Sequence, residues 1–169
     1  MHDCEDLIRI FNACFSETYQ TRLVRGDEEP LYLPMNETTP YHSVIFAHGF
    51  FSSALHECAH WLIAGASRRQ CVDYGYWYIP DGRSQAQQME FQVVEVKPQA
   101  LEWILSDAAG YKFQFSIDNL NGPEVDADTF KANVRAQVVR YREQGLWPRA
   151  LQFCRALEAF YHAKIFTIC

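Results

Sequence analysis

The stretch Ser53–Gly65 reads SALHECAHWLIAG and contains the pattern HExxH. In a helix, His56 and His60 project from the same face one turn apart, so both imidazoles can bind one metal ion. Small and apolar residues between them favour a helix, and Ser52 or Ser53 is suited to cap its start. The stretch therefore predicts a rigid helix that presents two metal ligands.

Two histidines do not complete a catalytic metal site, which normally takes three protein ligands. Three downstream glutamates are candidates for the third ligand: Glu90, Glu95 and Glu102. Glu95 lies among valines, where an unpaired carboxylate is costly to bury, so we expect it to be the ligand. Glu90 lies in a polar stretch, and Glu102 is suited to orienting an imidazole. The alternative is a buried helix whose histidines form only local hydrogen bonds.

Two histidines and one carboxylate allow more than one chemistry. With zinc and Glu57 as general base, the site resembles that of zincin-type metallopeptidases. With Fe(II) and open positions, it is the facial triad of non-haem oxygenases, here carried on helices because the chain contains no HxD pair. A third interpretation is a non-catalytic binding module stabilised by a structural metal. The spacing alone leaves these alternatives open.

The composition limits the class of protein. A length of 169 residues predicts a single domain, residues 1–169, with a sizeable core. A net charge of −6 argues against direct binding to nucleic acid, which needs clustered cations. Six cysteines without a CxxC pattern indicate neither a zinc ribbon nor a disulfide framework. No apolar run has membrane-spanning length and the N-terminus lacks signal-peptide character, so we expect a cytoplasmic protein without membrane contact.

The rest of the chain predicts an α+β fold that is mainly helical, with a small antiparallel sheet. Apolar spacing and cap signals indicate helices over 3–19, 84–110 with an interruption near Pro98, 126–143 and 148–163. Short β-friendly pieces on either side of Gly26 predict a hairpin. The alternating aromatic residues of 74–78 predict a strand that ends in a turn.

Several stretches resemble, in order, the bacterial elongation factor P hydroxylase family. They are GDEEPLYLP (26–34), VIFAHGFFSSALHECAHWLIAGASRR (44–69), VDYGYWYIPDGR (72–83), VEVKPQALEW (94–103) and DNLNG (118–122). The resemblance covers most of the chain, and only the C-terminal tail ending at Cys169 looks different. It implies hydroxylation of the β-lysylated lysine of elongation factor P, with dioxygen and a metal, Fe(II), on His56, His60 and Glu95.

If the substrate is a lysine side chain, further roles follow. Glu57 is suited to carrying protons beside the metal, and Arg68, Arg69 and Arg83 to contacting the protein substrate at the rim. Aromatic rings can stack on the cationic side chain, and carboxylates can bind its ammonium groups. The residues expected to contact substrate are Asp73, Tyr74, Tyr76, Trp77, Tyr78, Asp81 and, before the metal helix, His48.

Overall fold

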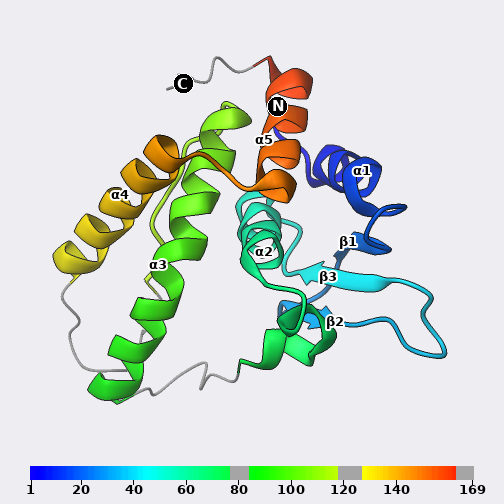
Figure 1. The fold of residues 1–169 in the computed structure, drawn as a ribbon, viewed down its shortest axis with the longest axis horizontal. Helices are drawn as coiled ribbons and strands as arrows, with labels where there is room; N and C mark the ends of the chain where they lie inside the picture. The colour runs from blue at the N-terminus through cyan, green and yellow to red at the C-terminus, as the bar shows by residue number, and fades with distance from the viewer. Residues whose placement is uncertain (77–83, 118–126, 163–169) are drawn as a thin grey trace.

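A computed structural model describes residues 1–76, 84–117 and 127–162 of the chain. These residues form five α-helices: α1 (Cys4–Phe15), α2 (Phe51–Ile63), α3 (Gln85–Ala108), α4 (Ala127–Gln144) and α5 (Pro148–Tyr161) (Figure 1). They also form three strands: β1 (Thr21–Arg25), β2 (Leu31–Leu33) and β3 (His42–Phe46). Short 3₁₀ turns cover Arg68–Gln70 and Val72–Gly75.

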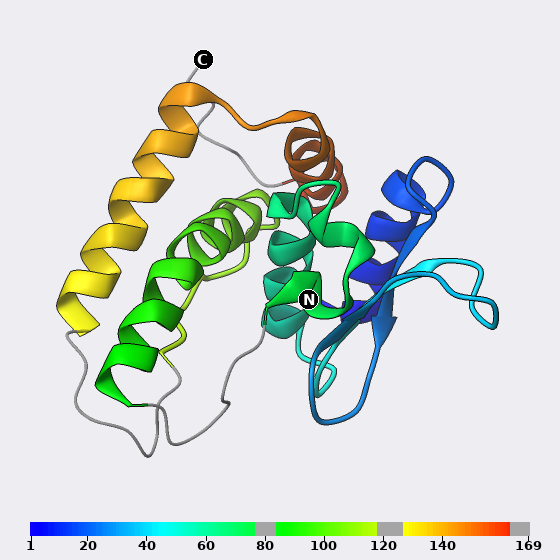
Figure 2. The same ribbon diagram turned by 60° about the horizontal axis from the view of Figure 1, so that its bottom comes forward.

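Helix α2 lies at the centre of the fold. Figures 1 and 2 show α3 and α4 on one side of it, and α1 with the sheet on the other. The face toward α1 and α5 is apolar, and Trp61 on it is fully buried, with its ring against those of Phe11 and Phe15. Because α2 is covered on both sides, its two histidines are held on a fixed scaffold between packed layers.

Side chains of other elements fix the end of α2. Arg149 of α5 donates to the carbonyls of Trp61 and Ala64 at 2.9 and 2.8 Å, and Trp147 donates to that of Leu62 at 2.7 Å. Arg69 adds a second bond to the Ala64 carbonyl at 2.7 Å. These bonds satisfy acceptors that a helix end leaves without partners. At the start, Phe50 is the N-cap and no side chain caps the helix, so the predicted serine cap is wrong.

Replacing Arg149 with methionine should therefore destabilise the fold. The variant leaves buried carbonyls at the end of α2 with fewer donors, and each lost charge-assisted bond costs about 1.5–3 kcal/mol. We expect the free energy of unfolding, measured by urea denaturation, to fall by about 2 kcal/mol or more. The control is Arg155→Met on the exposed face of the same helix. Equal stability of the two variants would contradict a capping role for Arg149.

The sheet is mixed rather than antiparallel. Its order is β1-β3-β2, with β1 parallel and β2 antiparallel to β3. The predicted hairpin around Gly26 is therefore wrong, and the hairpin is formed by β2 and β3. Gly26 continues the pairing instead: its N–H donates to the Phe46 carbonyl at 2.8 Å. A Cβ there would lie 2.4 Å from the Ile45 side chain, so this glycine permits a close approach and not a turn.

Two other local predictions are also corrected. Helix α3 runs unbroken through Pro98, although this proline cannot donate to the carbonyl of Val94. The described part of the predicted aromatic strand is a 3₁₀ turn, in which Asp73 and Tyr74 have φ values of 48° and 60°. The carboxylate of Asp73 accepts the Tyr32 N–H at 2.9 Å, which ties the turn to β2.

Three helix ends lie where signals in the sequence place them. Asp3 caps α1 by accepting the Glu5 N–H at 2.9 Å, and Pro148 is the first residue of α5. Gly145 follows α4 with a φ of 81°, a conformation that glycine adopts without strain.

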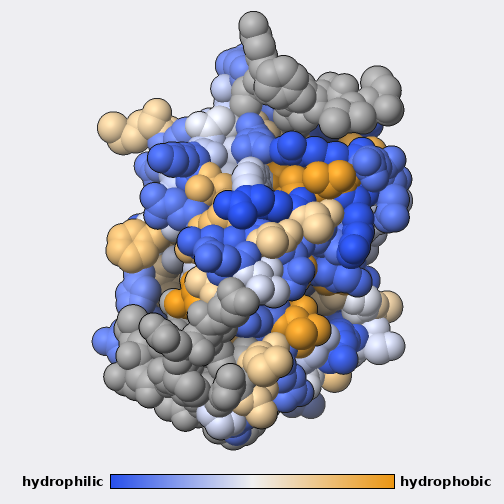
Figure 3. Space-filling view, turned by 90° about the vertical axis from the view of Figure 1, so that its left-hand side faces the viewer, coloured by the Kyte–Doolittle hydropathy of each residue, from blue (hydrophilic) through white to orange (hydrophobic). Residues whose placement is uncertain are grey.

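The outer face of α3 and α4 is mostly hydrophilic. Figure 3 shows small, separated apolar patches on this side of the molecule. Met89 and Val93 of α3 and Val139 of α4 are exposed apolar side chains. In the described part of the chain, no helix has the length and apolar character needed to cross a membrane.

Candidate metal centre

Three side chains from α2 and α3 meet between the two helices. His56 and His60 lie one turn apart on α2, and their Nε2 atoms are 3.1 Å from each other. Glu95 of α3 places Oε2 3.3 Å from Nε2 of His56 and Oε1 2.9 Å from Nε2 of His60. One donor atom from each residue lies within 4.8 Å of the other two. The chain thus brings together the two histidines and the glutamate that the sequence proposes as ligands.

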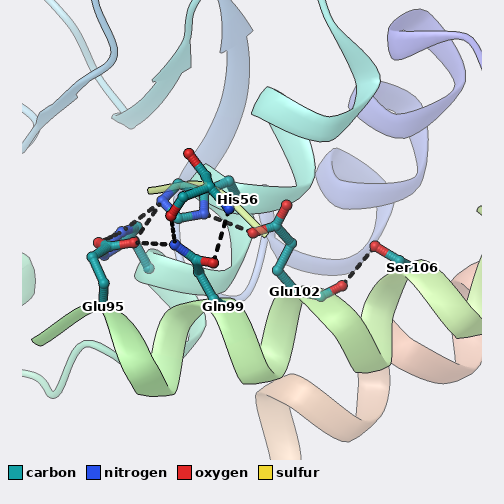
Figure 4. A network of polar contacts seen from close by, with 7 residues as sticks. His56, Glu95, Gln99, Glu102 and Ser106 are labelled. Carbon is teal, nitrogen blue, oxygen red and sulfur yellow. Dashed lines mark hydrogen bonds and ion pairs between the residues drawn. The ribbon is translucent and has the colours of Figure 1, made fainter. Parts of the chain in front are cut away.

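A second carboxylate fixes the orientation of one imidazole. The residue Glu102 is 6% exposed, and its Oε2 lies 2.8 Å from Nδ1 of His56 (Figure 4). This contact keeps a proton on Nδ1 and leaves Nε2, which faces Glu95, free to bind a cation. The backbone carbonyl of Glu102 accepts a hydrogen bond from the Ser106 hydroxyl at 2.7 Å, within the same helix.

The charges of the site depend on one another. Burial alone would lower the pKa of His56, but Glu95 and Glu102 raise it to about 10. Burial alone would raise the pKa of Glu95, but His56 and His60 lower it to about 2. At neutral pH the metal-free site therefore keeps Glu95 ionised and His56 protonated. The buried carboxylate requires a positive charge beside it, which a proton or a metal ion can supply.

This coupling predicts how the stability of the metal-free protein changes with pH. The pKa of His56 is raised in the folded state, so its stabilising effect is complete below about pH 6.5, the ordinary value. The effect is lost as pH rises toward about 10, the folded value. We expect the free energy of unfolding, measured with a chelator present, to fall over this window. His56→Gln should flatten the dependence, and an unchanged slope in that variant would refute the coupling.

Gln99 links the cluster to a neighbouring segment, a role that the sequence analysis missed. This side chain is 1% exposed, and its Nε2 lies 3.4 Å from Glu95 Oε2 and 2.6 Å from the Ser116 carbonyl. Its Oε1 accepts the Ser116 N–H at 3.2 Å. The signal was present in the sequence: Glu95, Gln99, Glu102 and Ser106 recur at helical spacing and form a polar stripe on one face of α3 (Figure 4).

A pocket of about 310 Å³ opens beside the cluster. It lies between the first half of α2, the second half of α3 and the segment that follows α3. The residues that line it are Ser52, Ser53, His56, Glu57, Glu102, Ser106, Tyr111, Lys112, Phe113, Gln114, Phe115 and Ser116. Of these residues, the sequence analysis gave a role in the site only to His56, Glu57 and Glu102.

The predicted substrate residues are placed differently. Tyr74 is 6% exposed, and its ring stacks on that of Tyr32 with the centroids 4.3 Å apart. The centroid of the Tyr74 ring lies 6.5 Å from that of His60, so Tyr74 lies beside the cluster. The carboxylate of Asp73 is bonded to the backbone of β2. Neither residue lines the pocket.

The remaining predicted residues also lie away from this pocket or outside the described chain. Tyr76 is exposed, with the guanidinium of Arg68 4.0 Å from its ring centroid. His48 is exposed in the turn before α2, with its ring 5.9 Å from that of Phe50. Trp77, Tyr78, Asp81 and Arg83 fall in 77–83, outside the described residues. Contact of these residues with substrate stays a prediction.

The donor set fits a divalent metal ion. Two imidazole nitrogens and one carboxylate leave coordination positions for other ligands, and this combination suits iron or zinc. Both histidine Nε2 atoms face Glu95, and the proton on His56 Nδ1 is held by Glu102. An ion bound by these three groups would replace the proton that now offsets the buried carboxylate.

Comparisons with known proteins agree with this geometry. A family model described as "Elongation factor P hydroxylase" matches residues 10–168. The match extends into the C-terminal tail, and the expected difference of this tail stays a prediction. The chain is 58% identical over 163 residues to the elongation factor P lysine hydroxylase of Haemophilus influenzae, a match that covers 96% of this chain and 92% of that protein. The chain therefore belongs to the elongation factor P hydroxylase family.

Proposed function

We propose that this protein hydroxylates a lysine side chain of elongation factor P, after β-lysylation of that lysine. Two observations support the proposal. The relative from Haemophilus influenzae is an elongation factor P lysine hydroxylase with 58% identity. The meeting of His56, His60 and Glu95 between α2 and α3 carries the chemical part of the argument, because it provides a 2-His-1-carboxylate donor set.

We propose that His56, His60 and Glu95 hold Fe(II), with dioxygen as co-substrate. When bound, such a metal supplies the one-electron chemistry with dioxygen that an unactivated carbon requires and that amino-acid side chains lack. The residues of the chain position the reaction. Glu102 orients the His56 ring through Nδ1, and the side-chain amide of Gln99 donates to Oε2 of Glu95. Both contacts reduce the reorganisation needed when a metal binds.

Glu57 is the candidate for proton transfer. It lines the pocket next to His56, and burial raises the pKa of its carboxyl, while His60 and His56 act in the opposite direction. A carboxyl whose pKa is moved toward neutrality is suited to accept and return a proton during the reaction. The same residue would be the general base of a peptidase, but family membership favours hydroxylation over peptide hydrolysis.

Mass spectrometry of elongation factor P tests the function directly. Factor isolated from cells that contain this protein should carry one additional oxygen atom on a single lysine, and factor from cells lacking it should not. The purified metal-loaded protein, supplied with dioxygen and a two-electron reductant, should add the same oxygen to the β-lysylated factor, with the second oxygen atom leaving as water. An unmodified factor in both assays, together with casein cleavage that is lost in Glu57→Ala, would instead establish the peptidase alternative.

A further inference from the structure

The pocket beside the metal centre is lined by a carboxylate, that of Glu57, without a directly bonded partner in the described residues. The Glu57 carboxylate is half-buried, and within the described residues it forms neither a hydrogen bond nor an ion pair. The other lining carboxylate, that of Glu102, is already bonded to His56. Of the cationic side chains that line the pocket, His56 is paired with Glu95 and Glu102, and Lys112 is exposed and forms no ion pair with Glu57 in the described part of the chain. A cationic group from outside would give Glu57 the partner it lacks.

The wall opposite α2 is formed before any ligand binds. The backbone of Ser116 is paired in both directions with the side-chain amide of Gln99. The ring of Phe113 stacks on Trp103 of α3, with centroids 4.9 Å apart and an angle of 13°. A wall held in this way costs little entropy to order when a ligand enters. The volume of about 310 Å³ lies at the lower end of small-ligand sites, which suits one extended side chain.

The position of the pocket indicates which part of a substrate it receives. Nε2 of His56 faces the metal centre, whereas Nδ1 faces Glu102, which lines the pocket. The pocket is therefore a neighbour of the metal centre, separated from it by the His56 ring. An aliphatic chain whose reacting carbon is at the metal can place its end there.

We propose that this pocket binds the ammonium-bearing end of the substrate side chain, with Glu57 as its counter-ion and the segment 111–116 as its wall. The proposal rests on the proposed function, because it takes a modified lysine as the substrate. It places recognition of the substrate cation at α2 and 111–116, and not at the aromatic run that begins at Asp73. The ligand class is an aliphatic chain that ends in a primary ammonium group.

A pair of small probes tests the charge requirement without using hydroxylation. The probes are 6-aminohexanamide, which has an aliphatic chain and an ammonium group, and heptanamide, which has a methyl group in place of the ammonium. Ligand-observed NMR with the full-length protein measures the binding of each. We expect the amine to bind at least tenfold more tightly than the neutral amide. Equal binding of the two probes would overturn the proposal.

Variants locate the binding site of the amine. Ser53 lines the pocket, so Ser53→Trp should fill it and weaken binding of 6-aminohexanamide at least tenfold, whereas Val139→Trp, on the exposed face of α4, should bind as the unmodified protein does. If Ser53→Trp does not fold, Glu57→Gln keeps the shape of the side chain and removes its charge. In this variant the ratio of the affinities for 6-aminohexanamide and heptanamide should approach one. Amine binding that survives both changes, or that is lost only in Tyr76→Ala, would refute this location.

The protein substrate gives the second readout. For β-lysylated elongation factor P, Ser53→Trp should raise KM at least tenfold with unchanged metal affinity, because Ser53 is not one of the three proposed ligands. An unchanged KM would overturn the proposal. If the unmodified protein fails to hydroxylate the factor at all, the proposed function fails, and the amine probes still decide whether the pocket binds a cation.

Discussion

Replacing Glu95 with glutamine is expected to abolish hydroxylation and to weaken binding of a divalent metal by more than about 100-fold. This loss of affinity is larger than that typical for a residue that only hydrogen-bonds to a metal ligand. The substitution keeps the size of the side chain and removes its charge. Glu95 is 4% exposed and is the carboxylate that faces both His56 Nε2 and His60 Nε2. Without it, a metal ion between the two imidazoles loses an anionic donor that no other described residue near it replaces.

The measurement is a metal-binding isotherm together with the yield of hydroxylated lysine. Glu90→Gln is the matched control, because Glu90 is an exposed glutamate on the same helix. It should retain both metal binding and activity. If Glu95→Gln bound metal within about threefold of the Glu90→Gln variant, the proposed ligand set would be wrong.

The cluster of His56, His60 and Glu95 could be predicted because the patterns that indicate it are local and chemical. His56 and His60 need only a helix to converge, and a carboxylate surrounded by valines needs a cation. Glu95 then followed from the cost of burying its charge, without knowledge of how α3 packs on α2. The helix ends at Asp3, Gly145 and Pro148 were predictable for the same reason, since caps depend on a few neighbouring residues.

The sheet and the pocket could not be predicted because they depend on contacts between distant parts of the chain. Gly26 looks like a turn residue in sequence, but it lies close to Ile45 in a strand paired in parallel. The pocket requires that Ser116 reach Gln99, a bond that no local pattern encodes. The aromatic run drew attention to Tyr74, whose burial on Tyr32 is decided by the packing of the turn on β2.

Replacing Trp61 with alanine is expected to lower the free energy of unfolding by about 3–5 kcal/mol, as for other fully buried aromatic side chains. Trp61 is 0% exposed and lies with ring centroids 5.3 and 4.8 Å from Phe11 and Phe15 of α1. The guanidinium of Arg149 lies 4.6 Å from its ring and would lose this contact too. Urea denaturation measures the effect, with Phe160→Ala, a 46% exposed aromatic residue of α5, as the control. Equal losses in the two variants would contradict the prediction.

The response of Trp61→Ala to metal separates the two faces of α2. A ligand that binds only the folded state stabilises it by an amount set by its concentration and affinity. Trp61 packs toward α1 and α5, whereas His56 and His60 face α3, so the variant should gain the same stability from saturating metal as the unmodified protein. Glu95→Gln should differ in both respects: it should lose stability even without metal, because the buried pairs of Glu95 with His56 and His60 are broken, and it should gain none from metal. A loss of the metal-induced gain in Trp61→Ala would mean that packing behind α2, and not only the donor set, determines the geometry of the metal centre.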